Sequence, residues 1–210
     1  MRNIQKGSEP PSLTEHRKTP HASYRNYLDK DTLRRYLVSE QGGICCYCMS
    51  RIRPTDAAMK IEHWQSQRHY PDRQIDYMNL LGSCLGGEGK PKRNQHCDTF
   101  KGDADLAINP ADPACNVERL LKFPGSGKVK SDDPHIEQAL NEVLNLNHPQ
   151  LVANRKAILD SFFQSIGKQR RSDSWFNREL TKWRGDGAGE LQEFNQVIVY
   201  YLCRKLNVTL

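Results

Sequence analysis

Residues 44–48 read Ile-Cys-Cys-Tyr-Cys, and this short stretch decides the fold. Cys45 and Cys48 form a C-x-x-C pair, a spacing that lets two thiolates bind one tetrahedral Zn²⁺ ion from a tight knuckle. Two further cysteines, Cys84 and Cys97, lie downstream and would complete a four-thiolate site. The sequence therefore predicts one structural zinc site made of these four residues.

The second pair of cysteines is spaced more widely than in a usual zinc ribbon, because residues 85–96 form a long insertion between Cys84 and Cys97. His96 is an alternative ligand, although a thiolate at Cys97 fits the knuckle better. A lone C-x-x-C pair is also typical of thiol redox proteins, but nothing nearby predicts the βαβ unit that such proteins use. The remaining cysteines are expected to be packed thiols without an assigned role: Cys46, Cys115 and Cys203.

The composition limits what surrounds this site. In 210 residues the chain has 31 Lys and Arg against 25 Asp and Glu, 37% hydrophobic residues and a mean hydropathy of −0.78. The core must be modest, and the length fits one medium domain or two small ones. The longest strongly apolar stretch, residues 197–203, is far shorter than the roughly 20 residues that span a bilayer. No apolar segment follows the basic start, so we expect no secretory signal, no membrane contact and a cytoplasmic protein.

Proline and apolar patterns divide the chain into three parts. Residues 1–28 contain prolines and basic residues without apolar periodicity, which favours a flexible or partner-binding N-terminal arm. Residues 29–112 contain the cysteine cluster and form the predicted site-bearing domain. Residues 113–210 are predicted to be a helical C-terminal region. The predicted fold class is α+β and mainly helical.

Capping and periodicity locate the individual elements. Asp29 or Asp31 can cap a helix that stops at the Gly42-Gly43 pair. Apolar stripes predict C-terminal helices near residues 136–144, 151–166, 172–183 and 191–201, while residues 119–130 predict two short strands around a Pro-Gly-Ser-Gly turn.

Three further patterns lie between and after the cysteines. They are, in order, Glu62-His63, Asn79-Leu80-Leu81 and Cys97-Asp98-x-x-Lys101-Gly102. A single histidine is more often structural than catalytic, although its ordinary pKa suits proton transfer near neutral pH. The patterns are informative only as a set.

With the C-x-x-C pair, this set resembles the HNH endonuclease motif in a zinc-stapled ββα-metal fold, over residues 36–110. The resemblance implies that His63 is the general base that activates water, and that Asn79 orients the loop bearing it. Glu62 would ligate the catalytic divalent cation, Mg²⁺ or Mn²⁺, with Asp98 at the third motif position. The family most often has Asn or His there, but aspartate also supplies a hard oxygen ligand.

These residue types suit phosphodiester hydrolysis, which needs a deprotonated water and positive charge at the phosphate oxygens. Thiolates prefer zinc and carboxylates prefer Mg²⁺ or Mn²⁺, so the two metals are expected in different places. The basic residues expected to contact nucleic acid are Lys90, Lys92 and Arg93 in the insertion, and Lys101 at a helix start. Residues 68–73 and 168–171 would extend such a track. A net charge of +6 is too diffuse to indicate nucleic-acid binding by itself.

The resemblance goes beyond the nuclease motif and points to one group within that family. The motifs that carry it are the opening Met1-Arg2-Asn3-Ile4-Gln5-Lys6-Gly7, the Gly-x-Cys-x-Tyr-Cys knuckle, and Leu144-Asn145-Leu146-Asn147 followed by Leu151 and Arg155. They resemble the HNH subunits of Septu-type anti-phage systems, the PtuB family, which also occur with retrons. The resemblance implies an effector nuclease that cuts DNA or a structured RNA such as tRNA. It also implies assembly with a PtuA-like ATPase of the ABC/SMC class and, in retron systems, with the reverse transcriptase and its nucleic acid.

An alternative function remains open at this level. Asp98 at the third motif position is also compatible with a catalytically inactive, zinc-stapled module that binds nucleic acid or protein. The chain contains no P-loop motif, so any nucleotide dependence would come from a partner.

Overall fold

A small antiparallel sheet pairs β1, Lys60–His63, with β2, Leu80–Ser83. The computed structural model describes residues 1–167, 170–185 and 189–210, and within these ranges the other regular elements are helical. A short helix, α3, Cys97–Lys101, follows β2 along the chain. The mainly helical α+β class is therefore confirmed, and the ββα-metal assignment stays a prediction.

Helix α2, Lys30–Glu40, begins at an aspartate cap as predicted. The side chain of Asp29 accepts a hydrogen bond from a backbone N–H of the first turn at 3.4 Å. Leu33 and Leu37 lie one turn apart and are both fully buried. The helix ends before two successive glycines with φ angles of 59° and 72°, which glycine adopts without steric cost. The chain thus turns directly into the cysteine knuckle.

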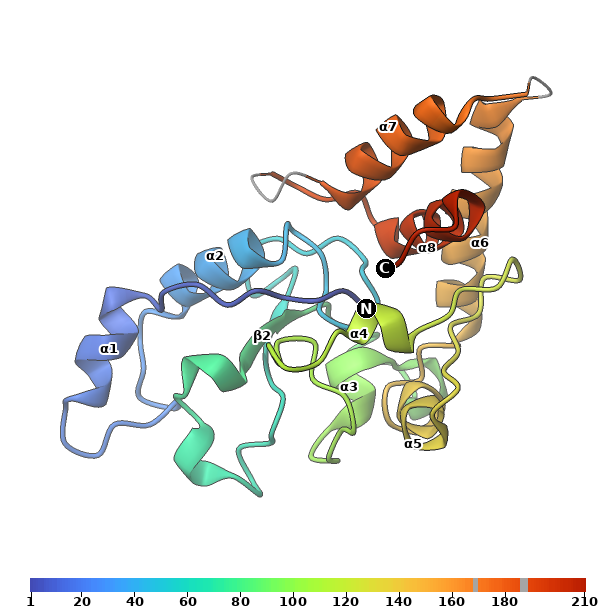
Figure 1. Ribbon diagram of the computed structural model, residues 1–210. Coiled ribbons are helices and arrows are strands. Elements are labelled where there is room, and N and C mark those ends of the chain that lie inside the picture. The colour runs from blue at the N-terminus through green and yellow to red at the C-terminus, as the bar shows by residue number, and fades with distance from the viewer. Residues whose placement is uncertain (168–169, 186–188) are drawn as a thin grey trace.

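Residues 1–28 are packed onto the rest of the chain, which corrects the prediction of a flexible arm. Met1 and Ile4 are buried in the main core, and helix α1, Pro11–Arg17, buries Leu13 completely. Figure 1 shows the first residues beside α4, with α1 at the far end of the molecule near α2. The buried residues are too far apart to show a period, and each fills a space between residues that are distant in sequence.

The predicted C-terminal helices are confirmed, with small shifts at their ends. They are α5, Pro134–Gln138, continued by a π-helical turn, Ala139–Val143; α6, Pro149–Ile166; α7, Asp173–Arg184; and α8, Asn195–Leu206. The two strands predicted within residues 119–130 are wrong. Residues 117–120 form helix α4, Val117–Leu120, and only one bridge, between Lys122 and Lys130, closes the turn.

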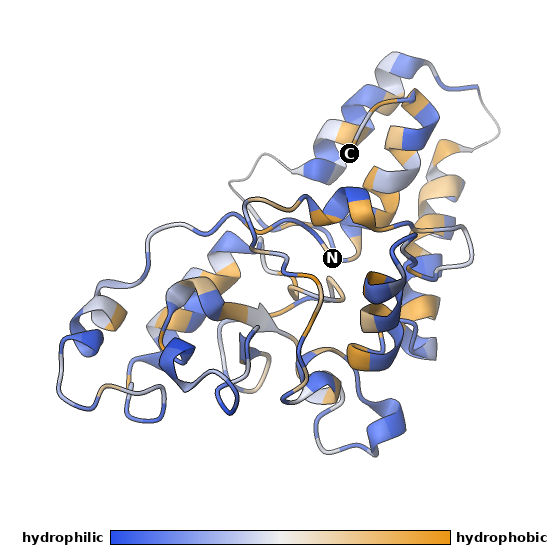
Figure 2. Cartoon of the chain, turned by 60° about the horizontal axis from the view of Figure 1, so that its bottom comes forward, coloured by the Kyte–Doolittle hydropathy of each residue, from blue (hydrophilic) through white to orange (hydrophobic). Residues whose placement is uncertain are grey.

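The hydrophobic core continues across the predicted boundary between residues 112 and 113. Ile44 and Leu81 belong to the same buried cluster as Leu140 and Val197. In Figure 2 the hydrophobic residues of the C-terminal helices gather where these helices meet. The C-terminal helices therefore complete the burial of the site-bearing part within the same chain. Within the described residues, no helix combines the length and the apolar content that crossing a bilayer requires.

Arg155 joins α6 to two loops, and replacing it tests how much these contacts stabilise the fold. Its side chain is buried, and it donates from Nε to the carbonyl of Gly127 at 2.6 Å and from Nη2 to that of Leu146 at 2.7 Å. Arg155→Met leaves two buried carbonyls without these donors, so we expect the free energy of unfolding in urea to fall by about 2–5 kcal/mol. The exposed neighbour gives the control, since Lys156→Met should change it by about 0.5 kcal/mol or less. An equal fall in the free energy of unfolding in both variants would contradict the role of Arg155 in joining α6 to the two loops.

Candidate functional site

Four cysteines from three segments of the chain meet in the core. Cys45 and Cys48 lie in the loop after α2, Cys84 directly follows β2, and Cys97 begins α3. All four are buried, and their Sγ atoms lie within 4.8 Å of one another. The structure therefore brings together the cluster that the sequence predicted.

The spacing of the sulfur atoms fits a tetrahedral zinc ion. With Zn–S bonds of about 2.3 Å, the S–S edges of a tetrahedron are about 3.8 Å long. The Sγ–Sγ distance is 3.9 Å between Cys45 and Cys97, and 3.7 Å between Cys48 and Cys84. The N–H of Ser50 also points to the Sγ atom of Cys48, at 3.4 Å. Such donors stabilise metal-bound thiolates, so the site fits structural zinc.

The other candidate ligands lie outside this cluster. His96 places Nδ1 at 3.2 Å from the Sγ atom of Cys97, beside the sulfurs but not among the four. The backbone N–H of Cys46 donates to the carbonyl of Gly82 at 3.0 Å, which attaches the knuckle to β2. Cys115 is half-buried and Cys203 is buried, both away from the cluster.

His63 ends β1 with its ring buried and its orientation fixed. Nε2 lies 2.9 Å from the carbonyl oxygen of Gln74, and because a carbonyl only accepts, Nε2 carries the proton and Nδ1 keeps its lone pair. The ring of Tyr24 packs edge-on against it, at 4.5 Å between centroids. Burial lowers the pKa of His63 to about 4, so the imidazole is neutral at pH 7. A neutral ring leaves one nitrogen free to accept a proton, although a pKa this low makes it a weak base.

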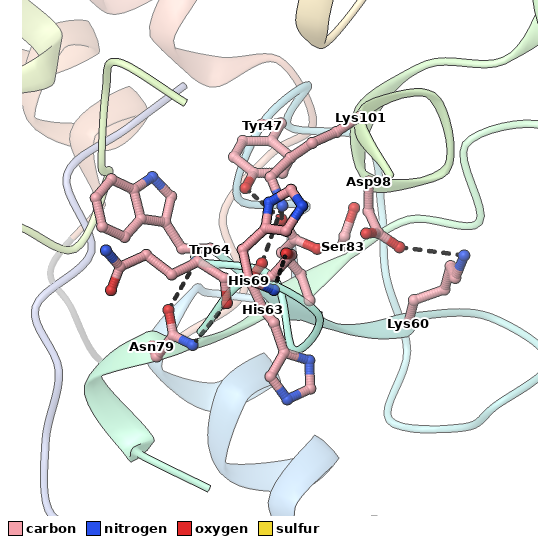
Figure 3. A network of polar contacts seen from close by, with 12 residues as sticks. Tyr47, Lys60, His63, Trp64, His69, Asn79, Ser83, Asp98 and Lys101 are labelled. Atoms are coloured by element: carbon pink, nitrogen blue, oxygen red, sulfur yellow. Dashed lines mark hydrogen bonds and ion pairs between the residues drawn. The ribbon is translucent and has the colours of Figure 1, made fainter. Parts of the chain in front are cut away.

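Asn79 fastens the loop that follows His63 (Figure 3). Its side chain is fully buried, and Oδ1 accepts from the N–H of Gln65 at 2.8 Å. Nδ2 donates to the carbonyls of Gln65 and Arg73, each at 3.0 Å. The carbonyl of Asn79 accepts from the N–H of Trp64 at 3.0 Å. These bonds give Asn79 the contacts that orienting the histidine-bearing loop requires.

Glu62 and Asp98, the two predicted cation ligands, face each other between β1 and α3. Their carboxyl groups are joined by a hydrogen bond. Glu62 is 1% exposed, and its Oε1 accepts from the Tyr47 hydroxyl at 2.6 Å and lies 2.8 Å from Nζ of Lys101. Asp98 lies 3.1 Å from Nζ of Lys60, a contact drawn in Figure 3. Each carboxyl group thus has a lysine beside it.

The pKa values of the two carboxyl groups are shifted in opposite directions. Burial, and then Asp98, raise the pKa of Glu62 well above its ordinary value, which Lys101 only partly offsets. Burial acts to raise the pKa of Asp98 too, but the hydrogen bond from Glu62 and the ammonium of Lys60 outweigh it, and that pKa is lowered. The two carboxyl groups therefore titrate as a coupled pair, with their pKa values moved in opposite directions.

The carboxyl pair also passes a simple test for Mg²⁺ or Mn²⁺. Mg²⁺ is commonly held by one or two carboxylates together with water and substrate phosphate. Glu62 and Asp98 supply hard oxygen donors that lie close together, and they would hold a cation between them. It would also compete with the ammonium groups of Lys60 and Lys101.

Sequence reasoning missed three residues that hold these groups. Tyr47 lies inside the knuckle, where an aromatic residue between ligands was the only signal. Lys60 precedes Glu62 by two positions on β1, and the two-residue period of a strand places both on one face. Tyr24 gave no signal, because it belongs to a segment without apolar periodicity.

The basic residues predicted to contact nucleic acid divide into two groups. Three are exposed in the insertion, and their contact with nucleic acid stays a prediction: Lys90, Lys92 and Arg93. Lys101 is instead buried, and its Nζ donates to the carbonyl of His63 at 2.9 Å. It lies one turn after Asp98 on the inner face of α3, so its ammonium holds β1 rather than facing outward. Of the basic segment 168–171, residues 168 and 169 lie outside the described residues.

Comparison with known proteins finds two relatives of this chain. No protein-family model matches the chain. The "Retron Vc95 putative HNH endonuclease" of Vibrio cholerae serotype O1 biovar El Tor is 28% identical over 134 residues, which cover 60% of this chain and 63% of that protein. The Septu protein PtuB of Bacillus thuringiensis is 25% identical over 124 residues, covering 58% and 46%. The chain is a homologue of both. It spans between about half and just under two thirds of the length of these curated relatives.

The predicted resemblance to the retron and Septu HNH proteins is thereby confirmed. One of these relatives is named a putative HNH endonuclease and the other a Septu protein. The individual roles of Glu62, His63, Asn79 and Asp98 go beyond what this similarity establishes.

Replacing one cluster cysteine tests the zinc site. Cys97→Ala removes one of four ligands and should reduce the zinc content of the purified protein from stoichiometric to a small fraction, with loss of cooperative thermal unfolding. Cys46→Ala is the matched control, because Cys46 is equally buried but contributes no ligand, and it should keep its zinc. Full zinc in the Cys97 variant, measured by elemental analysis, would exclude the four-thiolate site.

Proposed function

We propose that this chain is a metal-dependent HNH endonuclease that hydrolyses phosphodiester bonds of DNA, or of a structured RNA such as tRNA. The proposal rests on one arrangement: a neutral His63, held through Nε2, beside the buried carboxyl pair of Glu62 and Asp98. The ββα-metal fold of the family accommodates this arrangement, with β1 and β2 followed by α3.

In the proposed mechanism, His63 takes a proton from the attacking water through Nδ1. The carbonyl of Gln74 retains the proton on Nε2, which keeps the basic nitrogen available. Asn79 limits movement of the loop after His63 through its three side-chain hydrogen bonds. Tyr24 covers the ring and keeps it in one orientation.

Glu62 and Asp98 would hold the divalent cation, Mg²⁺ or Mn²⁺. When bound, the cation supplies positive charge to the phosphate and to the departing oxygen. Lys101 keeps Glu62 in place, and Lys60, whose side chain is 30% exposed, lies where it can approach a phosphate beside Asp98. The exposed basic insertion of residues 90–93 supports the nucleic-acid backbone further out.

We infer the setting from the homologues. The Septu protein PtuB suggests that the chain acts as the effector subunit of an anti-phage complex with a PtuA-like ATPase of the ABC/SMC class. The retron homologue adds a reverse transcriptase and its nucleic acid as further proposed partners. We place the complex in the cytoplasm, where thiols stay reduced and available to zinc.

A second candidate function is an inactive zinc-stapled module that binds nucleic acid or protein. This candidate is favoured because Oε1 of Glu62 already accepts a hydrogen bond from the Tyr47 hydroxyl and pairs with the Lys101 ammonium. A cation would have to compete with both partners for this oxygen. Cleavage of plasmid DNA or total tRNA by the purified chain, alone and with its ATPase partner, separates the two. No cleavage in any combination would favour the binding module.

His63→Ala tests the general base. This variant removes the proton acceptor, so cleavage should fall by at least about 10²-fold, the usual contribution of general-base catalysis, while the zinc content stays unchanged. His69→Ala is the control, because His69 is exposed and close in sequence, and it should retain full activity. A His63 variant that cuts at the wild-type rate would refute the base assignment.

Asp98→Ala tests the cation site. Losing one carboxylate should raise the Mg²⁺ concentration needed for half-maximal cleavage by about tenfold or more, because hard oxygen ligands supply the affinity. Asp103→Ala changes an exposed acid just after α3 and should leave this concentration unchanged. Equal Mg²⁺ requirements in all three proteins would remove Asp98 from the site.

A further inference from the structure

An aromatic cavity lies between α6, α8 and the turn of residues 122–130. Its volume is about 520 Å³, and none of its lining residues belongs to the candidate active site. Phe163 of α6 is 40% exposed there and packs against Tyr201 of α8, with ring centroids 4.9 Å apart at 79°. Tyr200 and Phe123 form a second edge-to-face pair in the lining, at 6.0 Å. Phe163 is the exposed ring of this group, Tyr200 and Tyr201 are half-buried, and Phe123 is buried. Aromatic side chains that line a concave site are typical of a ligand pocket.

The rim of this cavity carries only positive charge. Its charged lining residues are Lys122, Lys130, Arg204 and Lys205, and no acidic residue lines it. Lys122 and Lys130 are directly opposite in an antiparallel bridge, so both side chains leave the same face, an arrangement that repels in the absence of an anion. Asp132 pairs with Lys122, and within the described residues no ion pair neutralises Lys130, Arg204 or Lys205. The rim therefore suits a ligand with several negative charges.

The cavity is formed in advance of binding. Gly127 closes the turn against α6 with a φ of 82°, and a β-carbon there would lie 2.3 Å from the carbonyl of Val152. The buried Arg155 holds the same turn through the carbonyl of Gly127. The bridge between Lys122 and Lys130 closes the turn, which lies beside α6 and α8 and lines the cavity with them. A preformed site loses little conformational entropy when a ligand binds.

We propose that this cavity binds a single-stranded segment of nucleic acid, with one base on the aromatic floor and the flanking phosphates on the rim. Aromatic side chains stack on any base, and a basic groove follows the backbone, which is the usual combination in single-strand binding. A duplex keeps its bases stacked inside and cannot present one to the rings. The site works without the cleavage residues, so it would retain a strand independently of the proposed nuclease activity.

The test measures binding in a full-length His63→Ala protein without added Mg²⁺, so that cleavage does not interfere. A fluorescent 12-nucleotide single strand, as DNA and as RNA, is compared by anisotropy with a duplex of the same sequence. We expect the single strand to bind at least about tenfold more tightly than the duplex, with an affinity that falls as salt rises. A preference for duplex, or no binding of either strand, would overturn the proposal.

Two pairs of substitutions locate the binding. Phe163→Ala should weaken single-strand binding by about tenfold, while Phe163→Tyr keeps the ring and should retain it. Arg204→Glu should weaken binding and lower its salt dependence, whereas Arg178→Glu makes the same charge change on α7, outside the cavity, and should do neither. Wild-type affinity in the Phe163→Ala variant would overturn the proposal.

Competition identifies the class of ligand. Polyglutamate matches the charge of the strand without its bases, and adenosine monophosphate supplies one base and one phosphate without a strand. We expect neither competitor to displace the labelled strand when its negative charges are added at the same concentration as the phosphates of the strand. Displacement by polyglutamate would assign the cavity to an acidic peptide, and displacement by the mononucleotide would assign it to a free nucleotide, and either result would overturn the strand proposal.

Discussion

Four sulfur atoms from three distant segments converge within 4.8 Å, and the N-terminal half of the molecule depends on this convergence. Strands β1 and β2 are four residues long and α3 is five, lengths at which isolated elements are marginal in water. A metal bound to all four thiolates joins the knuckle, the end of β2 and the start of α3 at one point. Small folds with limited apolar content commonly rely on such a cross-link.

The same convergence sets the geometry of the candidate active site. Tyr47 stands between two zinc-site cysteines and gives its hydroxyl to Glu62, while Asp98 directly follows the cluster residue Cys97. A shift of the knuckle would therefore move Tyr47, which donates to Glu62, and a shift of α3 would move Asp98 itself. The thiolate cluster and the proposed cation site differ in ligand type, and adjacent residues connect them.

The carboxyl pair is accommodated in the core because each carboxyl group has a cation beside it. Lys101 accompanies Glu62, and Lys60 accompanies Asp98. Buried charges without such partners would cost several kcal/mol each. The consequence for function is that a divalent cation entering this site would compete with the ammonium groups of Lys60 and Lys101 for the carboxyl oxygens.

Much of this arrangement was predictable from local patterns, and the rest was not. Spacing alone predicted the four cysteines, since metal geometry limits which residues can share an ion. Capping and the helical period predicted α2 and the C-terminal helices, because both signals are local. The packing of residues 1–28, the burial of Lys101 and the single bridge at 122–130 were not predictable, since each depends on a surface built by distant segments.

The sequence by itself determined which residue types and spacings are available: soft thiolates in two pairs, a histidine after a glutamate, and an asparagine ahead of β2. Only the tertiary structure decided which of them meet. Lys101 points inward and pairs with Glu62, and the ring of Tyr24 packs against that of His63. The turn of residues 122–130 lies beside α6 and α8 and forms an aromatic cavity with them. The physical reason is that spacing along the chain constrains neighbours within a turn or strand, whereas burial and charge pairing are settled between elements far apart in sequence.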